Sequence, residues 1–172
     1  GSMLRKDDVL FPHYRGYAHV IAKGLGIEAI LAEVFGKEGG PAKGKGSFGN
    51  FISREHNICV NPITLGEGFG IALGIALGYK LKNDPRVTAI FFGDGASTRS
   101  PFYGALNLAA LWRVPLLFVC VNNQYSISRR YTDFSPTTIV EKARAFGLIG
   151  VSVDGNSIAD IYHTAEKIIS TV

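Results

Sequence analysis

Three apolar runs, at residues 87–92, 116–121 and 148–153, constrain the fold of this chain more than any other feature. Each has the length of a β-strand without regular polar alternation, and each is followed by a stretch with helical periodicity. Strands of this kind occur in parallel sheets whose two faces are both covered by helices. We therefore expect an α/β fold: a parallel sheet with helices on both faces.

The helices have recognisable limits. A helix over residues 65–81 is expected to stop at Asn83-Asp84-Pro85. Ser135-Pro136 has the pattern of an N-cap and first helical residue, which predicts a helix reaching Phe146. The Gly- and Lys-rich stretch 36–50 is expected to be a loop. Further helical patterns occupy residues 17–23, 27–35, 102–111 and 158–169.

Length and composition indicate one domain, placed at residues 4–172. Gly1-Ser2 is interpreted as a remnant of cloning, with no signal peptide after it. The net charge of +4 comes from scattered Lys and Arg, so nucleic-acid binding is not expected. Cys59 and Cys120 fall in apolar stretches and are expected to be small buried side chains in a reducing, cytoplasmic environment.

Glycines recur every four residues in the apolar segment 63–79, at Gly70, Gly74 and Gly78. The segment is shorter than the roughly 20 residues of a membrane-spanning helix and contains Glu67, so no membrane span is expected. Such a stripe lets another backbone approach closely. We expect a buried helix at a tight helix–helix or subunit contact.

Polar residues stand directly after two of the expected strands. Asp94 lies in a Gly-Asp-Gly turn, and Asn123 of the pair Asn122-Asn123 follows 29 residues later, the length of one strand–helix–strand crossover. If the strands are neighbours, both side chains meet at the carboxyl edge of the sheet, where such folds bind ligands. Carboxylate and amide oxygens suit Mg²⁺ or Ca²⁺, and a following helix N-terminus favours phosphate. A solvated Asp in a tight turn is the alternative.

The Gly-Asp-Gly and Asn-Asn pair resembles the thiamine-diphosphate fingerprint, and the resemblance extends over nearly all of residues 4–169. The chain resembles the α subunit of the E1 component of 2-oxoacid dehydrogenases, the family of the pyruvate, branched-chain and acetoin enzymes. It matches the middle portion of a typical α subunit. The segments that carry the resemblance are FPHYRGYAHVIAKG, KGKGS, LGEGFGIALGIALGYK, ALNLAALWRVPLLFVCVNNQYSIS and KARAFGLIGVSVDGN.

This resemblance implies a thiamine-diphosphate-binding fold, the diphosphate-binding module, with Mg²⁺ held by Asp94, Asn123 and the carbonyl of Tyr125. It implies that the amides of Gly95 and Ala96 meet the diphosphate.

The resemblance also implies that Tyr14 and Arg15 grip the diphosphate, where Arg supplies a forked and permanently charged donor. The stretch from Asn57 to Cys59 would lie along the aminopyrimidine, mainly through backbone atoms. No catalytic residue is assigned, and His13, His19, His56 and His163 are expected to be structural or exposed.

The implied activity needs a second chain. A β-type, pyrimidine-binding partner would complete the site, as an α2β2 heterotetramer, for decarboxylation of a 2-oxo acid and transfer of the acyl unit. With a lipoyl domain as the acceptor, the enzyme would be a dehydrogenase E1.

Three departures from the family pattern leave other readings open. Tyr17 and Gly49 stand where histidines are usual, and Arg99-Ser100-Pro101 replaces an acidic or amide residue followed by Gly. A biosynthetic carboligase subunit and a non-catalytic interaction subunit of the same fold are therefore alternatives. Dinucleotide binding at Gly24-Leu25-Gly26 is disfavoured because no buried strand precedes it.

Overall fold

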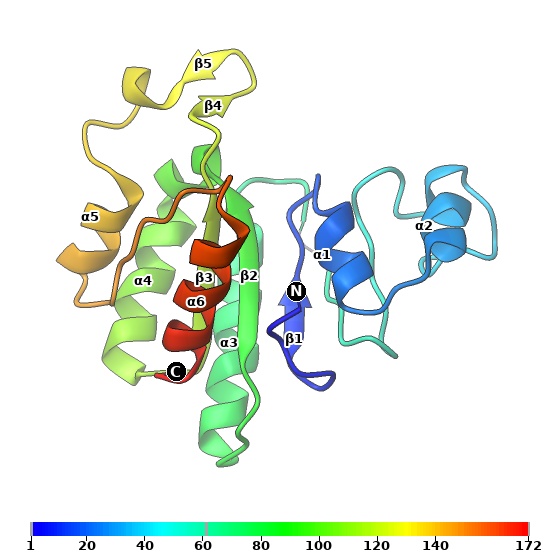
Figure 1. The fold of residues 1–172 in the computed structure, drawn as a ribbon, viewed down its shortest axis with the longest axis horizontal. Helices are drawn as coiled ribbons and strands as arrows, with labels where there is room; N and C mark the ends of the chain where they lie inside the picture. Colours follow the sequence, from blue (N-terminus) through cyan, green and yellow to red (C-terminus); the bar gives the residue numbers. More distant parts are fainter. Residues whose placement is uncertain (1, 61, 172) are drawn as a thin grey trace.

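The computed structural model describes residues 2–60 and 62–171. Gly1 of the expected cloning remnant and Val172, the last residue of the expected domain, lie outside the described residues. Its centre is a parallel sheet with the strand order β1-β2-β3 (Figure 1). The strands are β1 (Val9–Phe11), β2 (Thr88–Gly93) and β3 (Leu116–Val121). Phe11 is opposite Ile90, and Gly93 is opposite Val121. The predicted α/β fold with a parallel sheet is confirmed.

Strand β1 is absent from the sequence prediction because its three residues are too few to show a period. It is a strand because it is paired on both sides. On one side lies β2; on the other, the Leu10 amide donates to Asn57 O at 2.9 Å and the Cys59 amide donates to Leu10 O at 2.8 Å. Two distant segments therefore define β1.

The predicted strand at 148–153 is wrong, since the segment is irregular and Ile149, Val151 and Val153 are exposed. A strand needs a neighbour to take its backbone groups. Here the guanidinium of Arg144 donates to the Gly150 carbonyl from Nε and Nη2, at 3.1 and 2.8 Å. The Arg144 side chain therefore bonds a carbonyl that a neighbouring strand would otherwise bond.

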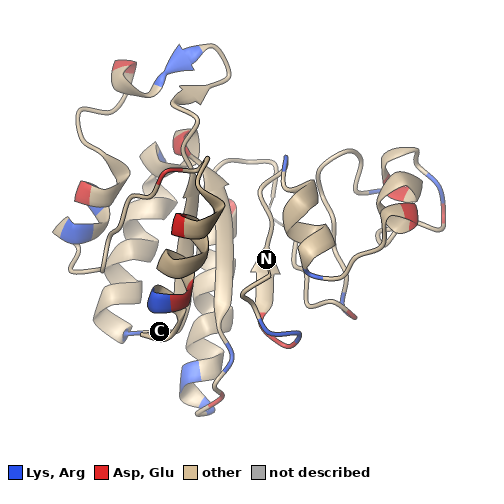
Figure 2. Cartoon of the chain, viewed as in Figure 1, with Lys and Arg blue, Asp and Glu red and all other residues tan. Residues whose placement is uncertain are grey.

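Six α-helices and two 3₁₀ segments flank the strands in the described residues, and a short hairpin follows β3. The hairpin pairs β4 (Tyr125–Ser126) with β5 (Arg129–Arg130), whose two arginines appear at the top of Figure 2. The helices are α1 (Tyr17–Ala22), α2 (Ile27–Val34), α3 (Glu67–Leu81), α4 (Ser100–Trp112), α5 (Ile139–Ala145) and α6 (Ile158–Ile169). The 3₁₀ segments η1 (Asp94–Thr98) and η2 (Tyr131–Asp133) follow β2 and β5.

Helix α5 begins three residues later than predicted. Thr138 and Glu141 form a reciprocal cap: the Thr138 hydroxyl accepts from the Glu141 amide, and the Glu141 carboxylate accepts from the Thr138 amide. The Ser135 hydroxyl instead donates to the Tyr131 hydroxyl and to the Thr137 carbonyl. The two-sided cap outcompetes the single Ser-Pro signal.

Two apolar clusters lie on opposite faces of the sheet. Helices α3 and α4 pack Phe69 and Phe102 against Phe92 of β2, with ring centroids 5.0–5.4 Å apart. On the other face, near β1, the smaller cluster joins Leu10 to α1, α2 and the segment that carries Phe51. Figure 1 draws α6 across β3, but none of its residues is buried. The helix therefore keeps its apolar side accessible.

Within α3 the glycine stripe is open rather than buried. Gly70 and Gly74 are exposed, and a Cβ built on either would meet no heavy atom within 4 Å. Phe69, Ala72 and Ala76 form the core side of the helix. The expected close helix–helix contact is thus wrong for the described part of this chain, and a subunit contact stays a prediction.

Among the described residues, none of the helices combines the length and apolarity needed to cross a membrane.

The loop after α2 is organised by one carboxylate. Glu33 is fully buried and accepts the amides of Ala42, Gly44 and Gly46 at 2.5–3.2 Å. Gly44 has φ +74°, which favours glycine. The predicted loop is therefore closely packed around the Glu33 carboxylate.

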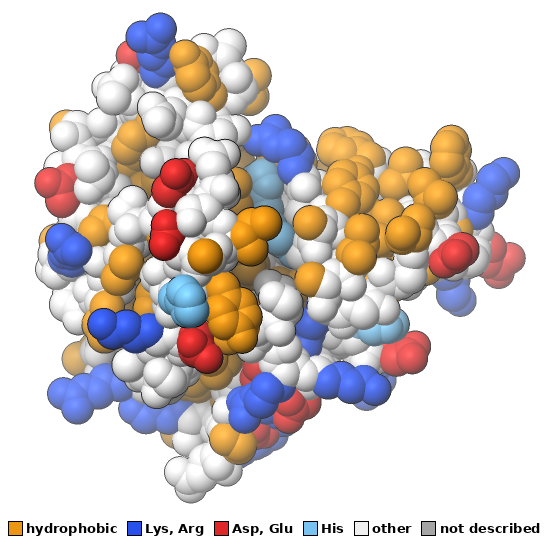
Figure 3. Space-filling view, in the orientation of Figure 1, with side chains coloured by type: hydrophobic (Ala, Val, Ile, Leu, Met, Phe, Trp, Pro, Cys, Tyr) orange, Lys and Arg blue, Asp and Glu red, His pale blue; other side chains and the backbone are white. Residues whose placement is uncertain are grey.

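Figure 3 shows apolar side chains gathered over the arm that α1, α2 and this loop form; Ile27, Leu31, Phe35 and Phe48 are exposed there.

Candidate functional site

The carboxyl ends of the three strands meet at one edge of the sheet. β1 leads to Tyr14 and Arg15, β2 leads to Asp94, and β3 leads to Asn123 (Figure 1). Because Gly93 pairs with Val121, the residues that follow these two positions leave the sheet side by side. The structure thus brings together three segments that lie far apart in the sequence.

Asp94 carries the most unusual atom of this edge. The residue is 2% exposed, and its Oδ1 accepts the Gly95 amide at 2.7 Å. Its Oδ2 is buried with no hydrogen-bond partner among the described residues. An unpaired buried carboxylate oxygen is costly, on the order of 1–3 kcal/mol or more. Such an atom is typical of a group kept free for a ligand.

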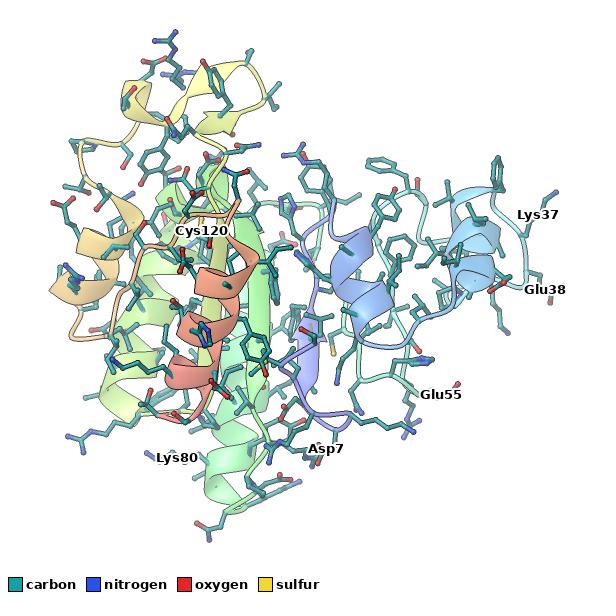
Figure 4. The ribbon with its side chains drawn as sticks, in the orientation of Figure 1. Asp7, Lys37, Glu38, Glu55, Lys80 and Cys120 are labelled. Atoms are coloured by element: carbon teal, nitrogen blue, oxygen red, sulfur yellow. The ribbon has the colours of Figure 1, made fainter. Side chains whose placement is uncertain are left out.

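The turn that holds Asp94 is fixed by its own side chains. Ser97 is fully buried and its Oγ donates to the Asp94 carbonyl at 2.6 Å, while Thr98 Oγ1 donates to the Gly95 carbonyl at 3.0 Å. Cys120, labelled near the end of β3 in Figure 4, is paired with Phe92 on the neighbouring strand, two residues before Asp94. Burial raises the pKa of its thiol strongly, and the Asp94 charge raises it further. Cys120 is therefore an uncharged thiol.

Gly95 brings the loops after β2 and β3 into contact. A Cβ on Gly95 would stand 2.4 Å from Ser126 Oγ and 2.9 Å from Ser126 Cβ. Only glycine fits here, so the hairpin packs directly on η1. Sequence reasoning missed Ser126; the second glycine of Gly-Asp-Gly was the one signal of a close neighbour.

Asn123 lies at the surface. Its Oδ1 accepts the Tyr125 amide at 3.0 Å, and Asn122 makes the equivalent bond to Gln124. An amide oxygen has a second lone pair, so this bond leaves it able to bind a further partner. Tyr125 is half-exposed and its hydroxyl accepts from Arg130 Nε at 3.1 Å. A metal shared by Asp94 and Asn123 stays a prediction.

Tyr14 and Arg15 form one unit at the end of β1. The Arg15 guanidinium lies 4.5 Å above the Tyr14 ring and donates to its hydroxyl. His13, which is buried beside them, has its Nε2 3.2 Å from the Cβ position of Gly93. Burial, with a smaller contribution from Arg15, lowers the His13 pKa to about 4. The neutral imidazole of His13 therefore packs against Gly93, the residue before Asp94. Sequence reasoning missed this contact.

The stretch from Asn57 to Cys59 uses its backbone groups to pair with other segments of the chain. The Asn57 carbonyl and the Cys59 amide pair with the backbone of Leu10, and both backbone groups of Ile58 pair with Ser53. The Asn57 amide side chain donates to the Lys6 carbonyl at 3.2 Å. Fewer backbone groups of this stretch are therefore free to contact an aminopyrimidine than the sequence suggested. That contact stays a prediction.

Two of the departures from the family pattern are coupled to each other. The Tyr17 hydroxyl donates to the Phe48 carbonyl, next to Gly49. A Cβ on Gly49 would stand 2.7 Å from the Tyr14 carbonyl oxygen. This backbone has no room for a histidine at position 49. The loop 36–50 instead packs its backbone against Tyr14.

The donor set at the edge is oxygen-rich and poor in carboxylates. No three His, Cys, Asp or Glu side chains gather into a metal-binding group anywhere in the described residues. One carboxylate, amide oxygens and backbone carbonyls suit Mg²⁺, which takes few protein ligands and completes its shell with water and phosphate. A pocket of about 410 Å³ lies beside the segment that follows β3. Its lining includes Asn122, Gln124, Tyr125, Arg130 and Tyr131.

The fold and this edge define an α/β protein with a parallel sheet and a candidate ligand site at its carboxyl end. The chain belongs to the dehydrogenase E1 component family, which matches residues 2–169.

Named relatives agree with this assignment. The chain is 37% identical over 167 residues to the alpha subunit of acetoin:2,6-dichlorophenolindophenol oxidoreductase from Bacillus subtilis, covering 96% of this chain and 50% of the relative. It is 35% identical over 176 residues to pyruvate dehydrogenase E1 component subunit alpha from Porphyra purpurea, covering 98% and 51%. The chain therefore spans about half the length of these relatives.

Proposed function

We propose that this chain is the diphosphate-binding part of an α-type subunit of a thiamine-diphosphate-dependent enzyme. With a β-type partner, it would decarboxylate a 2-oxo acid and transfer the acyl unit. Family membership supports the class, and the unpaired, buried Oδ2 of Asp94 is the observation that carries the site. A non-catalytic subunit would have no need to keep that atom unpaired.

Each residue of the edge has a role in this proposal. Asp94, Asn123 and the Tyr125 carbonyl would hold Mg²⁺, while Arg15 and Tyr14 would hold the diphosphate. Of the two candidate amides, Ala96 is the better diphosphate donor, because the Gly95 amide already donates to Asp94 Oδ1. When bound, thiamine diphosphate supplies the electron sink for decarboxylation. The chain's own residues orient it and exclude water around Asp94.

A partner surface is part of the proposal. The open glycine stripe of α3 and the exposed apolar arm are unpartnered faces that a β-type chain would cover. An α2β2 heterotetramer, a lipoyl acceptor and a cytoplasmic location are the assembly and setting that we propose.

One observation favours a carboligase as the second candidate. The Tyr14 carbonyl excludes a histidine at position 49, and Tyr17 takes the place of another. Loss of both imidazoles changes the groups that could receive or donate protons near the acceptor. Transfer of the acyl unit to an aldehyde or ketone, rather than to a lipoyl group, would fit that change.

Calorimetric titration of the chain in complex with its β-type partner tests the proposal, with thiamine diphosphate and Mg²⁺ as ligands. We expect binding that Asp94→Asn weakens strongly and that the matched Asp84→Asn leaves unchanged. Asp84 precedes β2 and pairs with Arg86, away from the carboxyl edge. Absence of binding by the wild-type complex would favour the non-catalytic alternative. Product analysis with lipoyl and aldehyde acceptors then separates the two catalytic candidates.

A further inference from the structure

Lys142 of α5 is a buried cation without a carboxylate partner. It is 8% exposed, and the ion pairs of the described residues involve other side chains, Arg5 with Asp8 and Arg86 with Asp84. Its Nζ lies 5.3 Å from the Tyr131 ring centroid and 5.6 Å from that of Tyr103. Two aromatic faces compensate only part of the cost of burying an ammonium group.

A hydrogen bond of the Lys142 side chain leads to the candidate site. Its Nζ donates to the Ser97 carbonyl at 3.3 Å, and Ser97 Oγ donates to the Asp94 carbonyl at 2.6 Å. Both Ser97 and Asp94 are buried. Two successive hydrogen bonds therefore connect a buried positive charge on α5 to the turn that holds the unpaired carboxylate oxygen.

Two other lysines show what a purely structural role looks like. Lys23 donates to the carbonyls of Arg5 and Lys6, near the acidic Asp7 and Asp8. Lys80 donates to the Trp112 carbonyl and is exposed at the lower end of α3, far from the Cys120 label in Figure 4. Lys142 differs because its carbonyl partner belongs to η1.

We propose that Lys142 is a positioning residue for Asp94. It holds the Ser97 end of η1, which keeps Asp94 Oδ2 in place for a ligand, and it places a positive charge behind a site that contains the Asp94 carboxylate and would receive a diphosphate. This inference rests on the proposed function. It assigns α5, which contributes no predicted ligand, to the binding machinery.

The test uses the chain with its β-type partner and measures Mn²⁺ affinity by electron paramagnetic resonance with thiamine diphosphate present. We expect Lys142→Met to weaken Mn²⁺ binding by roughly 10- to 100-fold, the usual effect of losing an outer-shell support. Lys142→Arg should recover most of the affinity, because it keeps the charge and a donor. Lys23→Met, at an equally buried lysine whose carbonyl partners lie outside η1, is the matched control and should bind as the wild type does.

The outcomes separate this inference from the proposed function. If wild-type complex binds neither Mn²⁺ nor thiamine diphosphate, the proposed function fails and the inference fails with it. If Asp94→Asn weakens binding but Lys142→Met does not, the inference alone is overturned. Thermal unfolding without ligand is measured in parallel: affinity loss that simply tracks the loss of stability, without rescue by Lys142→Arg, would also overturn it.

Discussion

Gly95 of η1 and Ser126 of β4 touch so closely that a Cβ on the glycine would stand 2.4 Å from the serine Oγ. This contact joins the loops that follow two neighbouring parallel strands. It places the turn of Asp94 directly against the hairpin that begins beside Asn123. The candidate site depends on that contact.

Gly95→Ala should therefore disturb the site as well as the fold. Inserting a methyl group into a packed contact costs about 1–3 kcal/mol. We expect a lower melting temperature and weaker thiamine-diphosphate binding, measured by thermal unfolding and calorimetry. Ser126→Gly in the same chain should restore both, because it removes the colliding side chain. Gly104→Ala is the matched control: a Cβ there meets nothing within 4 Å, so it should be neutral or slightly stabilising.

Glu33→Gln should loosen the arm. Its carboxylate accepts three loop amides in a buried position, and hydrogen bonds to a charged group are worth about 1.5–3 kcal/mol each. The variant should be destabilised by ~2–4 kcal/mol and cleaved faster by protease within residues 36–50. Glu28→Gln, an exposed residue of the same helix, should behave as the wild type. Equal protease resistance in both variants would contradict this role for Glu33.

The stability of the metal-free protein should fall in mildly acidic solution. Burial lowers the pKa of both His13 and His19 to about 4, below the value near 6.5 of an unfolded chain. Between these values the unfolded state binds more protons, so stability is complete above about pH 6.5 and is lost as pH falls toward 4.

Denaturant titrations from pH 7 to pH 4 measure this loss, which we expect to be ~2–4 kcal/mol for the pair. His19→Gln should flatten the profile, whereas His163→Gln, at an exposed position of α6, should not. A profile that keeps its full slope in the His19 variant would show that other groups cause it.

Gly74→Ala separates folding from assembly. A methyl group at this position meets no atom of the chain, and alanine favours the helix by about 0.5–1 kcal/mol. The variant should therefore be as stable as the wild type or more so, yet associate more weakly with the β-type partner. Gly104→Ala again serves as the control, and native mass spectrometry reports the assembly. Unchanged association would remove the stripe from the proposed interface.

The central strands were predictable because their signal is local. Apart from Thr88, residues 87–92 and 116–121 are apolar on both faces, and the structure buries or half-buries most of them. The run at 148–153 carries a similar local signal, but a strand also requires a neighbour, and Arg144 takes its Gly150 carbonyl. Conversely β1 has almost no local signal and exists because two distant segments pair with it.

The site was predictable where it follows from topology. Neighbouring parallel strands end at one edge, so the placement of Asp94 and Asn123 followed from the strands alone. Ser126, His13 and Lys142 reach the site through contacts between distant segments, and their neighbours in the sequence do not reveal these contacts.

The central claim is that Asp94 and Asn123 share one divalent cation that also binds a diphosphate. Anomalous diffraction from crystals of the complex with its β-type partner, grown with Mn²⁺ and thiamine diphosphate, tests it most directly. We predict a single manganese peak within bonding distance of Asp94 Oδ2, Asn123 Oδ1 and a phosphate oxygen. A peak bound elsewhere, or one that leaves either side chain outside its coordination shell, would contradict the account.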